Sequence, residues 1–529
     1  MERTPSCDQP QAYNALMPKQ DLPLSERTCP VEMSDRKPCG RPVHQQRWAD
    51  DPDYVCIMHT HDPNKEYGSY SEAFEQELRS ICEGRSIHNR TQNKWDFQSF
   101  VFFKPNFANW LCGAKKEINF SAATFAKVAD FSGSSFDRDV DFKGARFREG
   151  ATFERTTFEQ QARFWSVLFA GQANFGWASF ADADFSQAVF QGEAAFGRAR
   201  FSGSAKFWYV TFDGLTRFSS TTFSREADFR GAIFAHEALF HLTKFSGIAN
   251  FRWVYFKNSE HAVFHRINEA GPGLRVRFAD SLLENVRFED VNWNRKDRRI
   301  CLQDEADLGG APDATEVDNP AAVLTFELVA DVYRRLVNNF EKRRQYEWAE
   351  ECFLGEMEMR RRNPRHFLLG RLAPVKRLHE SFSWARWLGE NVSLTSLYCG
   401  LSKYGSSYTR ALGVLIGFIV LFAVLLPAFG LRMPADSRVQ AQCPLAVGGS
   451  SEAAVISWGC ALRHPQLARQ VIHTFDAGLW DALEVAVFQK NRTIEPATAG
   501  ARRLENFETV VIPGQFALLL LAIRRRFRR

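Results

Sequence analysis

The chain has 529 residues, with 67 basic and 62 acidic side chains and a formal net charge of +5. One hydrophobic core does not extend over this length, so we expect several modules. The small net charge does not indicate bulk binding of nucleic acid. Phenylalanine is the outlier in composition, with 48 residues against 11 tyrosines and 13 tryptophans, which indicates a structural use that is repeated many times.

The N-terminal segment, residues 1–95, is predicted to be a Cys/His-rich cap with a helix. Its start, MERTPSCDQP, lacks the apolar core of a secretory signal, so we expect it in the cytoplasm. Three cysteines and one histidine form the donor set of a closed structural zinc site. These residues are Cys29, Cys39, Cys56 and His59. We expect one structural zinc, with His44 and His61 as substitute ligands; the alternative is a set of ordinary reduced cysteines in a loop-rich cap.

Residues 96–300 contain a phenylalanine repeat that is not helical. From Phe120 to Phe256 there are 26 phenylalanines, separated by five or six residues only. On a helix these steps would turn by about 140° and about 240°, which places successive rings on two separate faces. The 11 glycines between positions 119 and 256 would each cost a helix interior roughly 0.8–1.0 kcal/mol relative to alanine. A helix is therefore rejected.

The residue two positions before each of these phenylalanines indicates short strands. It is Ala, Ser, Thr or Val, with Ile118 as the one larger exception. In an extended chain, positions two apart point to the same side, so each strand sends one small and one large side chain inward. The residue between them points outward and is often acidic or an amide. The expected core includes Phe131, Phe142, Phe153, Phe164, Phe175, Phe185, Phe196 and Phe207.

The runs ADFSG at 129–133 and ADFSQ at 183–187 resemble the pentapeptide repeat, A-(D/N)-(L/F)-x-x, in a phenylalanine-rich variant. The resemblance implies a right-handed, four-sided β-helix, a solenoid whose interior holds the large residue and the small residue before it. The extra residue at every second unit departs from the family pattern, and we assign it to a wider corner. Four inward rings per coil would give a stack of about 31 Å at about 4.8 Å per rung. We expect Phe97, Phe102 and Phe107 to begin the stack, which resumes after an insertion at Phe278, Leu283, Phe288 and Trp293.

The charge of the repeat segment bears on whether the solenoid imitates DNA, one of the functions that the resemblance suggests. Some pentapeptide-repeat proteins imitate DNA and inhibit DNA gyrase, which requires a strongly acidic face. Between positions 119 and 256 there are 14 acidic and 15 basic residues, so a DNA mimic is not favoured. The solenoid is expected to act either as a passive spacer or as a binding surface for a cytoplasmic protein.

Helical periodicity follows the repeats. Residues 301–320 are predicted to be a linker, and residues 321–405 a cytoplasmic helical segment with a juxtamembrane helix. Two apolar faces predict an antiparallel helix pair, similar to a single tetratricopeptide-like hairpin. The first comprises Val329, Val332, Tyr333, Leu336, Val337 and Phe340, and the second Trp348, Ala349, Cys352, Phe353 and Met357.

Residues 406–529 predict a membrane hairpin with two transmembrane helices. Residues 411–430 are 20 residues without a charge, long enough for a hydrocarbon core of about 30 Å. The second span, 507–523, contains Pro513 and runs into the basic end 524–529; a re-entrant helix is the alternative. Basic residues flank both spans, which predicts cytoplasmic termini and an external loop at 431–504.

The external loop carries two further candidate sites. Cys443 and Cys460 would lie in a compartment that permits disulfides, so we expect them to pair; two free thiols are the alternative. Residues 474–489, with Asp476, Asp481 and Glu484, resemble the pore helix of two-helix cation channels. The chain continues with KNRT at 490–493 instead of a potassium selectivity filter, so potassium selectivity is not supported.

No catalytic motif occurs in the sequence, so the chain is not expected to be an enzyme. We predict a membrane-anchored scaffold in the inner membrane of a bacterial cell, with the lipid membrane and a cytoplasmic protein as partners and without nucleic acid. The alternative is an oligomeric pore, assembled through the membrane hairpin and gated by the cytoplasmic domains.

Overall fold

The fold is that of a computed structural model, in which the chain forms two compact units, Met1–Leu324 and Thr325–Arg529. Each unit is described by itself. The structure describes residues 24, 27–44, 47–51, 53–66, 69–83, 85–86, 94–103, 107, 115–308, 323–363, 394–432, 455–462, 467–486 and 495–527.

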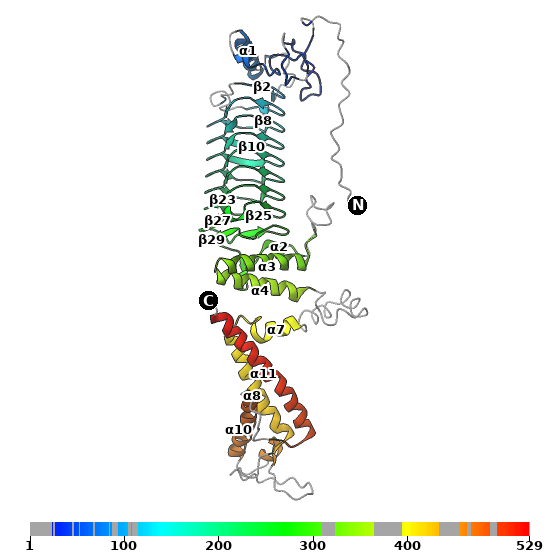
Figure 1. The fold of residues 1–529 in the computed structure, drawn as a ribbon, viewed down its shortest axis with the longest axis vertical. Coiled ribbons are helices and arrows are strands. Elements are labelled where there is room, and N and C mark those ends of the chain that lie inside the picture. Colours follow the sequence, from blue (N-terminus) through cyan, green and yellow to red (C-terminus); the bar gives the residue numbers. More distant parts are fainter. Residues whose placement is uncertain are drawn as a thin grey trace, which may run out of the picture. The chain divides into compact units, whose positions relative to one another are not determined.

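The first unit contains the predicted β-solenoid, which has about eight turns, and its strands pair in parallel from coil to coil (Figure 1). One sheet has 13 strands: β1 (Lys94–Asp96), β3 (Glu117–Asn119), β6 (Ser135–Phe136), β7 (Val140–Asp141), β10 (Thr157–Arg163), β13 (Ser179–Asp184), β16 (Arg200–Phe201), β17 (Ala205–Lys206), β20 (Thr222–Phe223), β21 (Ala227–Asp228), β24 (Lys244–Phe245), β25 (Ile248–Asn250) and β28 (Arg275–Arg277). A second sheet has eight: β2 (Val101–Phe102), β4 (Thr124–Phe125), β8 (Arg146–Phe147), β11 (Leu168–Phe169), β14 (Val189–Phe190), β18 (Thr211–Phe212), β22 (Ile233–Phe234) and β26 (Tyr255–Phe256). The third also has eight: β5 (Ala129–Asp130), β9 (Gly150–Thr152), β12 (Gln172–Asn174), β15 (Ala194–Ala195), β19 (Thr216–Arg217), β23 (Ala238–His241), β27 (Ala262–His265) and β29 (Arg287–Glu289).

Phenylalanine rings fill the solenoid in columns that run from coil to coil. Phe153 stacks on Phe131, with ring centroids 4.8 Å apart and planes within 1°, and Phe175 stacks on Phe153 at 4.9 Å. The alanines two positions earlier, such as Ala151, are buried beside them. Each buried ring contributes on the order of 1.5–3 kcal/mol. The eight rings expected in the core are fully buried: Phe131, Phe142, Phe153, Phe164, Phe175, Phe185, Phe196 and Phe207.

Both ends of the stack extend beyond positions 120–256. Phe97 stacks on Phe120 and Phe107 on Phe131, with centroids 5.1 and 4.7 Å apart. Within the predicted insertion, β27 places Phe264 on Phe240 at 4.6 Å, so part of that insertion belongs to the solenoid. The sequence did not predict this strand because Phe264 follows Phe256 by eight residues rather than by five or six.

Two kinds of corner explain the alternating spacing. Gly133 and Arg155 each follow a ring by two positions and have left-handed backbone, with φ of 67° and 55°. Such a residue makes a tight turn, which gives the five-residue step to the next ring. The outward residue before the ring stabilises this turn, because Asp130 Oδ1 accepts a hydrogen bond from the backbone N of Ser132 at 2.9 Å. The extra residue lies in the other corners.

Glycine is required where these wider corners of neighbouring coils touch. A Cβ atom on Gly214 would lie 2.2 Å from the carbonyl oxygen of Gly192, whereas a Cβ on Gly197 has its nearest neighbour, Ser219 O, at 3.8 Å. We expect Gly214→Ala to destabilise the solenoid by about 1–3 kcal/mol through overpacking. Gly197→Ala is the matched control and should leave stability unchanged or raise it. Thermal unfolding followed by circular dichroism checks this; equal melting temperatures for the two variants would contradict it.

The C-terminal end of the solenoid is closed by a buried set of ion pairs. A hairpin of β30 (Arg295–Lys296) and β31 (Arg299–Ile300) leads into the short helix α2 (Gln303–Ala306). The carboxylate of Asp304, fully buried, accepts hydrogen bonds from Arg252 Nε at 3.1 Å and from the backbone N of Phe278 at 2.6 Å. Residues 301–308, the start of the predicted linker, thus pack on the last coils. They satisfy polar groups of the sheet edge that would otherwise be exposed for pairing.

The second unit begins with a helical hairpin of α3 (Phe326–Lys342) and α4 (Tyr346–Arg362). Thr325 caps α3, since its side chain accepts a hydrogen bond from the backbone N of Leu328 at 3.1 Å. The two helices approach closely where Tyr333 lies over Gly355, because a Cβ at Gly355 would be 2.5 Å from the ring. Burial alone would raise the pKa of Glu358, but hydrogen bonds from Arg361 and Arg362 lower that pKa to about 2. The predicted helix pair is present.

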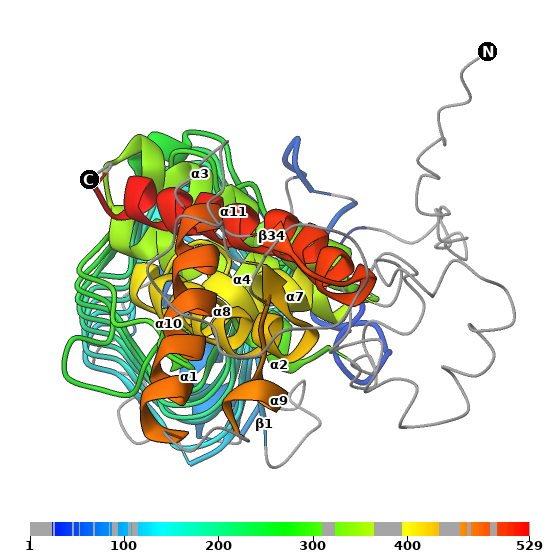
Figure 2. The ribbon, with the colours of Figure 1, turned by 90° about the horizontal axis from the view of Figure 1, so that it is seen from below.

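Three long helices of the second unit pack together (Figures 1 and 2). They are α8 (Tyr408–Phe429), α10 (Leu467–Ala486) and α11 (Ala499–Phe527). The short α7 (Leu394–Ser402) precedes them, and α9 (Trp458–Ala461) precedes α10; β32 (Leu431–Arg432), β33 (Val455–Ile456) and β34 (Glu495–Pro496) form a small antiparallel sheet. Two of the helices, α8 and α11, are long and apolar enough to cross a membrane. They correspond to the predicted spans 411–430 and 507–523.

The helices α8 and α11 run antiparallel along their length. Gln515 Nε2 donates to the carbonyl oxygen of Ala411 at 2.9 Å near one end, and Thr498 Oγ1 donates to that of Phe429 at 2.7 Å near the other. The third helix, α10, comes close to α8 at Gly478, where a Cβ would lie 2.3 Å from Ala423 O. One side of the predicted pore-helix segment, at residues 474–486, therefore packs against both apolar helices.

Candidate functional site

A β-hairpin brings the first two cysteines of the predicted zinc group together. Antiparallel bridges join Thr28 to Pro42 and Glu32 to Pro38. Cys29 and Cys39 lie across from one another, since the backbone N of Cys39 donates to Val31 O at 2.7 Å and that of Gly40 to Cys29 O at 3.2 Å. Nine intervening residues thus form the two arms and the turn of one hairpin.

The other two ligands come from a single turn. The backbone N of His59 and that of Thr60 each donate to Cys56 O at 3.0 Å. Lys65 Nζ holds the turn from outside by donating to the carbonyl oxygens of Ile57 at 3.1 Å and Thr60 at 2.8 Å. After it come the 3-10 helix η2 (Pro63–Glu66) and the helix α1 (Ser69–Cys82).

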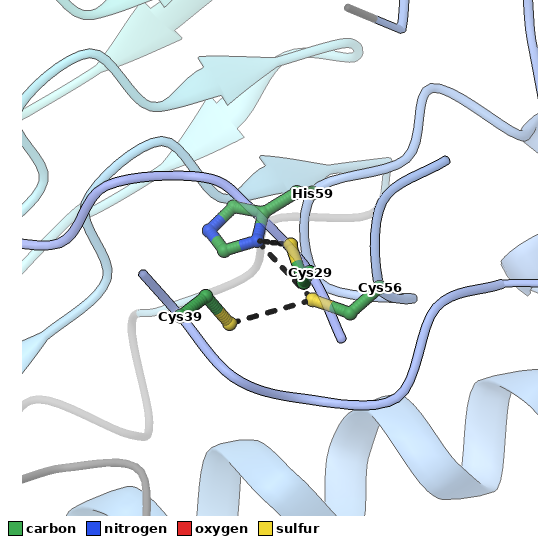
Figure 3. Close-up of side chains that lie close together, drawn as sticks. All are labelled: Cys29, Cys39, Cys56 and His59. Atoms are coloured by element: carbon green, nitrogen blue, oxygen red, sulfur yellow. Dashed lines mark hydrogen bonds between the residues drawn. The ribbon is translucent and has the colours of Figure 1, made fainter. Parts of the chain in front are cut away.

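The four side chains converge on one point (Figure 3). All four are buried, and their ligand atoms lie within 4.8 Å of one another. His59 Nδ1 is 3.3 Å from Cys29 Sγ and 3.2 Å from Cys56 Sγ, while Cys39 Sγ and Cys56 Sγ are 3.8 Å apart. Tetrahedral bonds of about 2.3 Å to sulfur place two ligand atoms about 3.8 Å apart. The group could therefore hold one metal ion with little movement.

A second layer of contacts orients the ligands. His59 Nε2 lies 3.2 Å from the carbonyl oxygen of Gln98, which belongs to the first coil of the solenoid. This contact places the ring proton on Nε2 and leaves Nδ1 as the lone pair for a metal. Arg41 Nη1 donates to Cys39 Sγ at 3.2 Å, and its guanidinium also pairs with Glu77 at 2.6 Å. Neither Arg41 nor Gln98 was predicted, because only the folded hairpin and the solenoid bring them to the cluster.

The thiols have strongly divergent acidities. Hydrogen bonding with Cys29 and Cys56 holds the pKa of Cys39 well below its usual range, whereas the bond with Cys39 raises the pKa of Cys29 to about 11. Burial raises the pKa of Cys56 further. The three neighbouring thiol groups cannot all carry a negative charge unless a cation lies among them. This donor chemistry fits a thiolate-binding metal ion.

The two substitute ligands lie outside the group of four. His61 Nδ1 is 2.8 Å from Asp51 Oδ1, and His44 Nε2 is 3.7 Å from Asp62 Oδ2. Burial would raise the pKa of Asp51, but the hydrogen bond from the backbone N of His61, together with others, lowers it. These pairs stabilise the loop around the cluster.

The pore-like residues of α10 divide into two environments. Asp476 is exposed, whereas Asp481 and Glu484 are buried in the packing of α10 against α8 and α11. Two polar residues of α11, Glu508 and Gln515, are buried in the same bundle and were not predicted as site residues. The sequence feature that could have identified these two residues is the presence of polar side chains within an otherwise apolar segment. Cys443 lies outside the described residues, so the disulfide with Cys460 stays a prediction, as does the role of the residues 490–493.

Comparisons with known proteins identify the repeats. Residues 120–168 and 196–244 match a family model described as pentapeptide repeats, in 9 copies. Both ranges lie within the β-solenoid. A search of curated proteins found no match to the chain.

Proposed function

Since this chain is a pentapeptide-repeat protein, we propose that it is a membrane-anchored scaffold whose solenoid presents a rigid surface to a cytoplasmic protein partner. The solenoid would be right-handed and four-sided, and the protein would have no catalytic activity and bind no nucleic acid. The helices α8 and α11 would span the inner membrane, with both termini in the cytoplasm.

An exposed apolar stripe carries the proposal of membrane anchoring. On α8, Leu412, Ile416, Val420 and Val424 recur every fourth residue, and each side chain is between 42% and 52% exposed. Residues at this spacing share one helix face. A contiguous apolar surface of this kind is rare on a monomeric water-soluble protein, whereas hydrocarbon solvates it. The buried side of α8 meets α10 and α11, which leaves the stripe to face lipid.

We further propose that the group Cys29, Cys39, Cys56 and His59 holds one structural zinc ion. Three thiolates and one imidazole are a common donor set of closed zinc sites. When bound, zinc would offset most of the negative charge of the thiolates and join the hairpin to the Cys56 turn. The contact from His59 to Gln98 would then fix this module on the first coil, so that zinc supports the N-terminal cap of the solenoid.

The orientation can be tested with reporter fusions. Green fluorescent protein is expected to fluoresce at either terminus, and alkaline phosphatase to be active only when inserted between 433 and 450. Phosphatase activity at the N-terminus would place the solenoid outside the cytoplasm, and the proposed role with a cytoplasmic partner would then be wrong.

The burial of carboxylates among apolar helices favours a second candidate function, an oligomeric pore. Ionisable residues at membrane depth are costly and usually serve transport. If Glu484 lines a conducting path, Glu484→Leu should abolish an ion flux measured with the full-length protein in vesicles, while the exposed Asp476→Leu serves as the matched control. The scaffold proposal predicts no flux for any of the three proteins and a monomer in detergent. A closed oligomer with a Glu484-dependent flux would support the pore instead.

A further inference from the structure

Two histidines outside the cysteine group face each other on the surface of the solenoid. His241 ends β23 and His265 ends β27, and these strands pair in register, so one imidazole lies above the other. Their Nδ1 atoms are 2.8 Å apart, and the rings have centroids 4.8 Å apart with planes 27° apart. At this distance two lone pairs would repel, so either one Nδ1–H donates a hydrogen bond to the other Nδ1, or a metal ion lies between the two nitrogens.

The charge of a neighbouring carboxylate favours an unprotonated Nδ1 atom on His265, where this ring faces His241. Asp290 Oδ2 is 3.6 Å from His265 Nε2, beyond hydrogen-bond distance, and its negative charge favours a proton on that nitrogen over one on Nδ1. In that tautomer, His265 Nδ1 is the unprotonated atom that faces His241. Two nearby arginines repel a bound cation only weakly, because each forms an ion pair with a glutamate. Arg266 pairs with Glu269 at 2.5 Å, and Arg287 pairs with Glu289 at 2.7 Å.

The pair lies where the repeat is irregular. From His241 to His265 the coil spans 24 residues, whereas Phe218 and Phe240 in the preceding coil are 22 residues apart. The longer coil includes the 3-10 helix η3 (Ser259–His261). An ion held by both imidazoles would join the coils on either side of this insertion.

We propose that His241 and His265 form a surface site for a late first-row divalent cation such as Cu²⁺, Ni²⁺ or Zn²⁺. Imidazole is a preferred ligand of these ions, and bonds of about 2.0–2.1 Å require the two nitrogens to separate to roughly 3 Å. The rings therefore need to move only slightly. Binding displaces the proton that one Nδ1 atom carries, which leaves for solvent or is replaced by a proton on Nε2 of the same ring, and water completes the coordination. This site is independent of the cysteine group and of the membrane anchor.

Copper titration of the full-length protein, with its cysteine group loaded with zinc beforehand, tests the proposal. Electron paramagnetic resonance should report one equivalent of Cu²⁺ with two nitrogen ligands from imidazole. His241→Ala and His265→Ala are each expected to weaken binding by about tenfold or more. His236→Ala is the matched control, because His236 is an exposed solenoid histidine outside the pair.

The His236→Ala control distinguishes a specific copper site from adventitious binding of copper to surface histidines. If His236→Ala weakens binding as much as His241→Ala does, or if His241→Ala leaves it unchanged, the proposal is overturned. Circular dichroism should show that the variants keep the solenoid. Should an alanine variant fail to fold, His241→Gln and His265→Gln keep a polar side chain of similar length and are expected to show the same loss of copper.

Discussion

A Cys56→Ser variant is expected to lose its zinc together with the protease resistance of the N-terminal module. Cys56 Sγ lies 3.2 Å from His59 Nδ1 and 3.8 Å from Cys39 Sγ, so it touches two of the other three ligands. The free energy of zinc binding in small zinc-folded modules is about 10–16 kcal/mol, and it contributes to folding because the unfolded chain has no preformed site. Removing one ligand should therefore unfold residues 27–66 while the phenylalanine core of the solenoid persists.

Elemental analysis and limited proteolysis of the full-length protein check this result. The wild type should contain about one equivalent of zinc, and a chelator should have the same effect as the Cys56→Ser substitution. Cys82→Ser is the matched control, because Cys82 lies in α1 of the same unit but outside the group of four. A wild-type protein that resists protease without any bound metal contradicts the proposal.

Asp304→Asn is expected to destabilise the C-terminal end of the solenoid by about 1–3 kcal/mol, the usual cost of leaving a buried polar group unsatisfied, because Arg252 keeps its second ion pair, with Asp307 at 3.4 Å. The substitution keeps the size of the side chain but removes the charge that faces Arg252 Nε at 3.1 Å. The Arg252 side chain is only 7% exposed, so water cannot take the place of the carboxylate. The last coils should fray first, since Phe278 N also donates to Asp304.

Hydrogen exchange localises this effect and separates it from a general loss of stability. Faster exchange is expected around β25 and β28, with little change near β8 or β11. Glu269→Gln is the comparison, because Glu269 and Arg266 form an exposed pair that should be worth less than about 1 kcal/mol. If both substitutions changed hydrogen exchange around β25 and β28 equally, the buried pair would not stabilise this end of the solenoid.

The solenoid could be predicted because each of its strands repeats the same local rule. A small residue such as Ala151 and a ring such as Phe153, two positions apart, must share the interior of an extended chain. The backbone geometry of the corners could not be predicted, because residue types such as Arg155 and Trp177 do not indicate a left-handed backbone. The sequence predicted an insertion at β27 because Phe264 follows Phe256 by eight residues, although Phe264 continues a ring column.

The candidate metal group was visible because its residue types are specific, whereas its surroundings were not. Cys29 and Cys39 are joined by hairpin pairing, which their spacing permits but does not specify. Arg41 and the carbonyl of Gln98 reach the group through contacts between segments far apart in the chain. In the second unit, the apolar runs predicted α8 and α11, but the packing of α10 against α8 depends on a local close approach at Gly478.

The partition of the full-length protein in membranes washed with alkaline carbonate tests the membrane-anchored scaffold most directly. We predict that the wild type stays with the membranes and is released only by detergent, because in the proposed arrangement the exposed apolar stripe at Ile416 and Val420 faces lipid. A variant with both Ile416→Arg and Val420→Arg should insert poorly, since an arginine at the centre of a spanning helix costs about 2.5–3.5 kcal/mol. Recovery of the folded wild type in the carbonate supernatant would contradict the proposal that α8 and α11 anchor the solenoid.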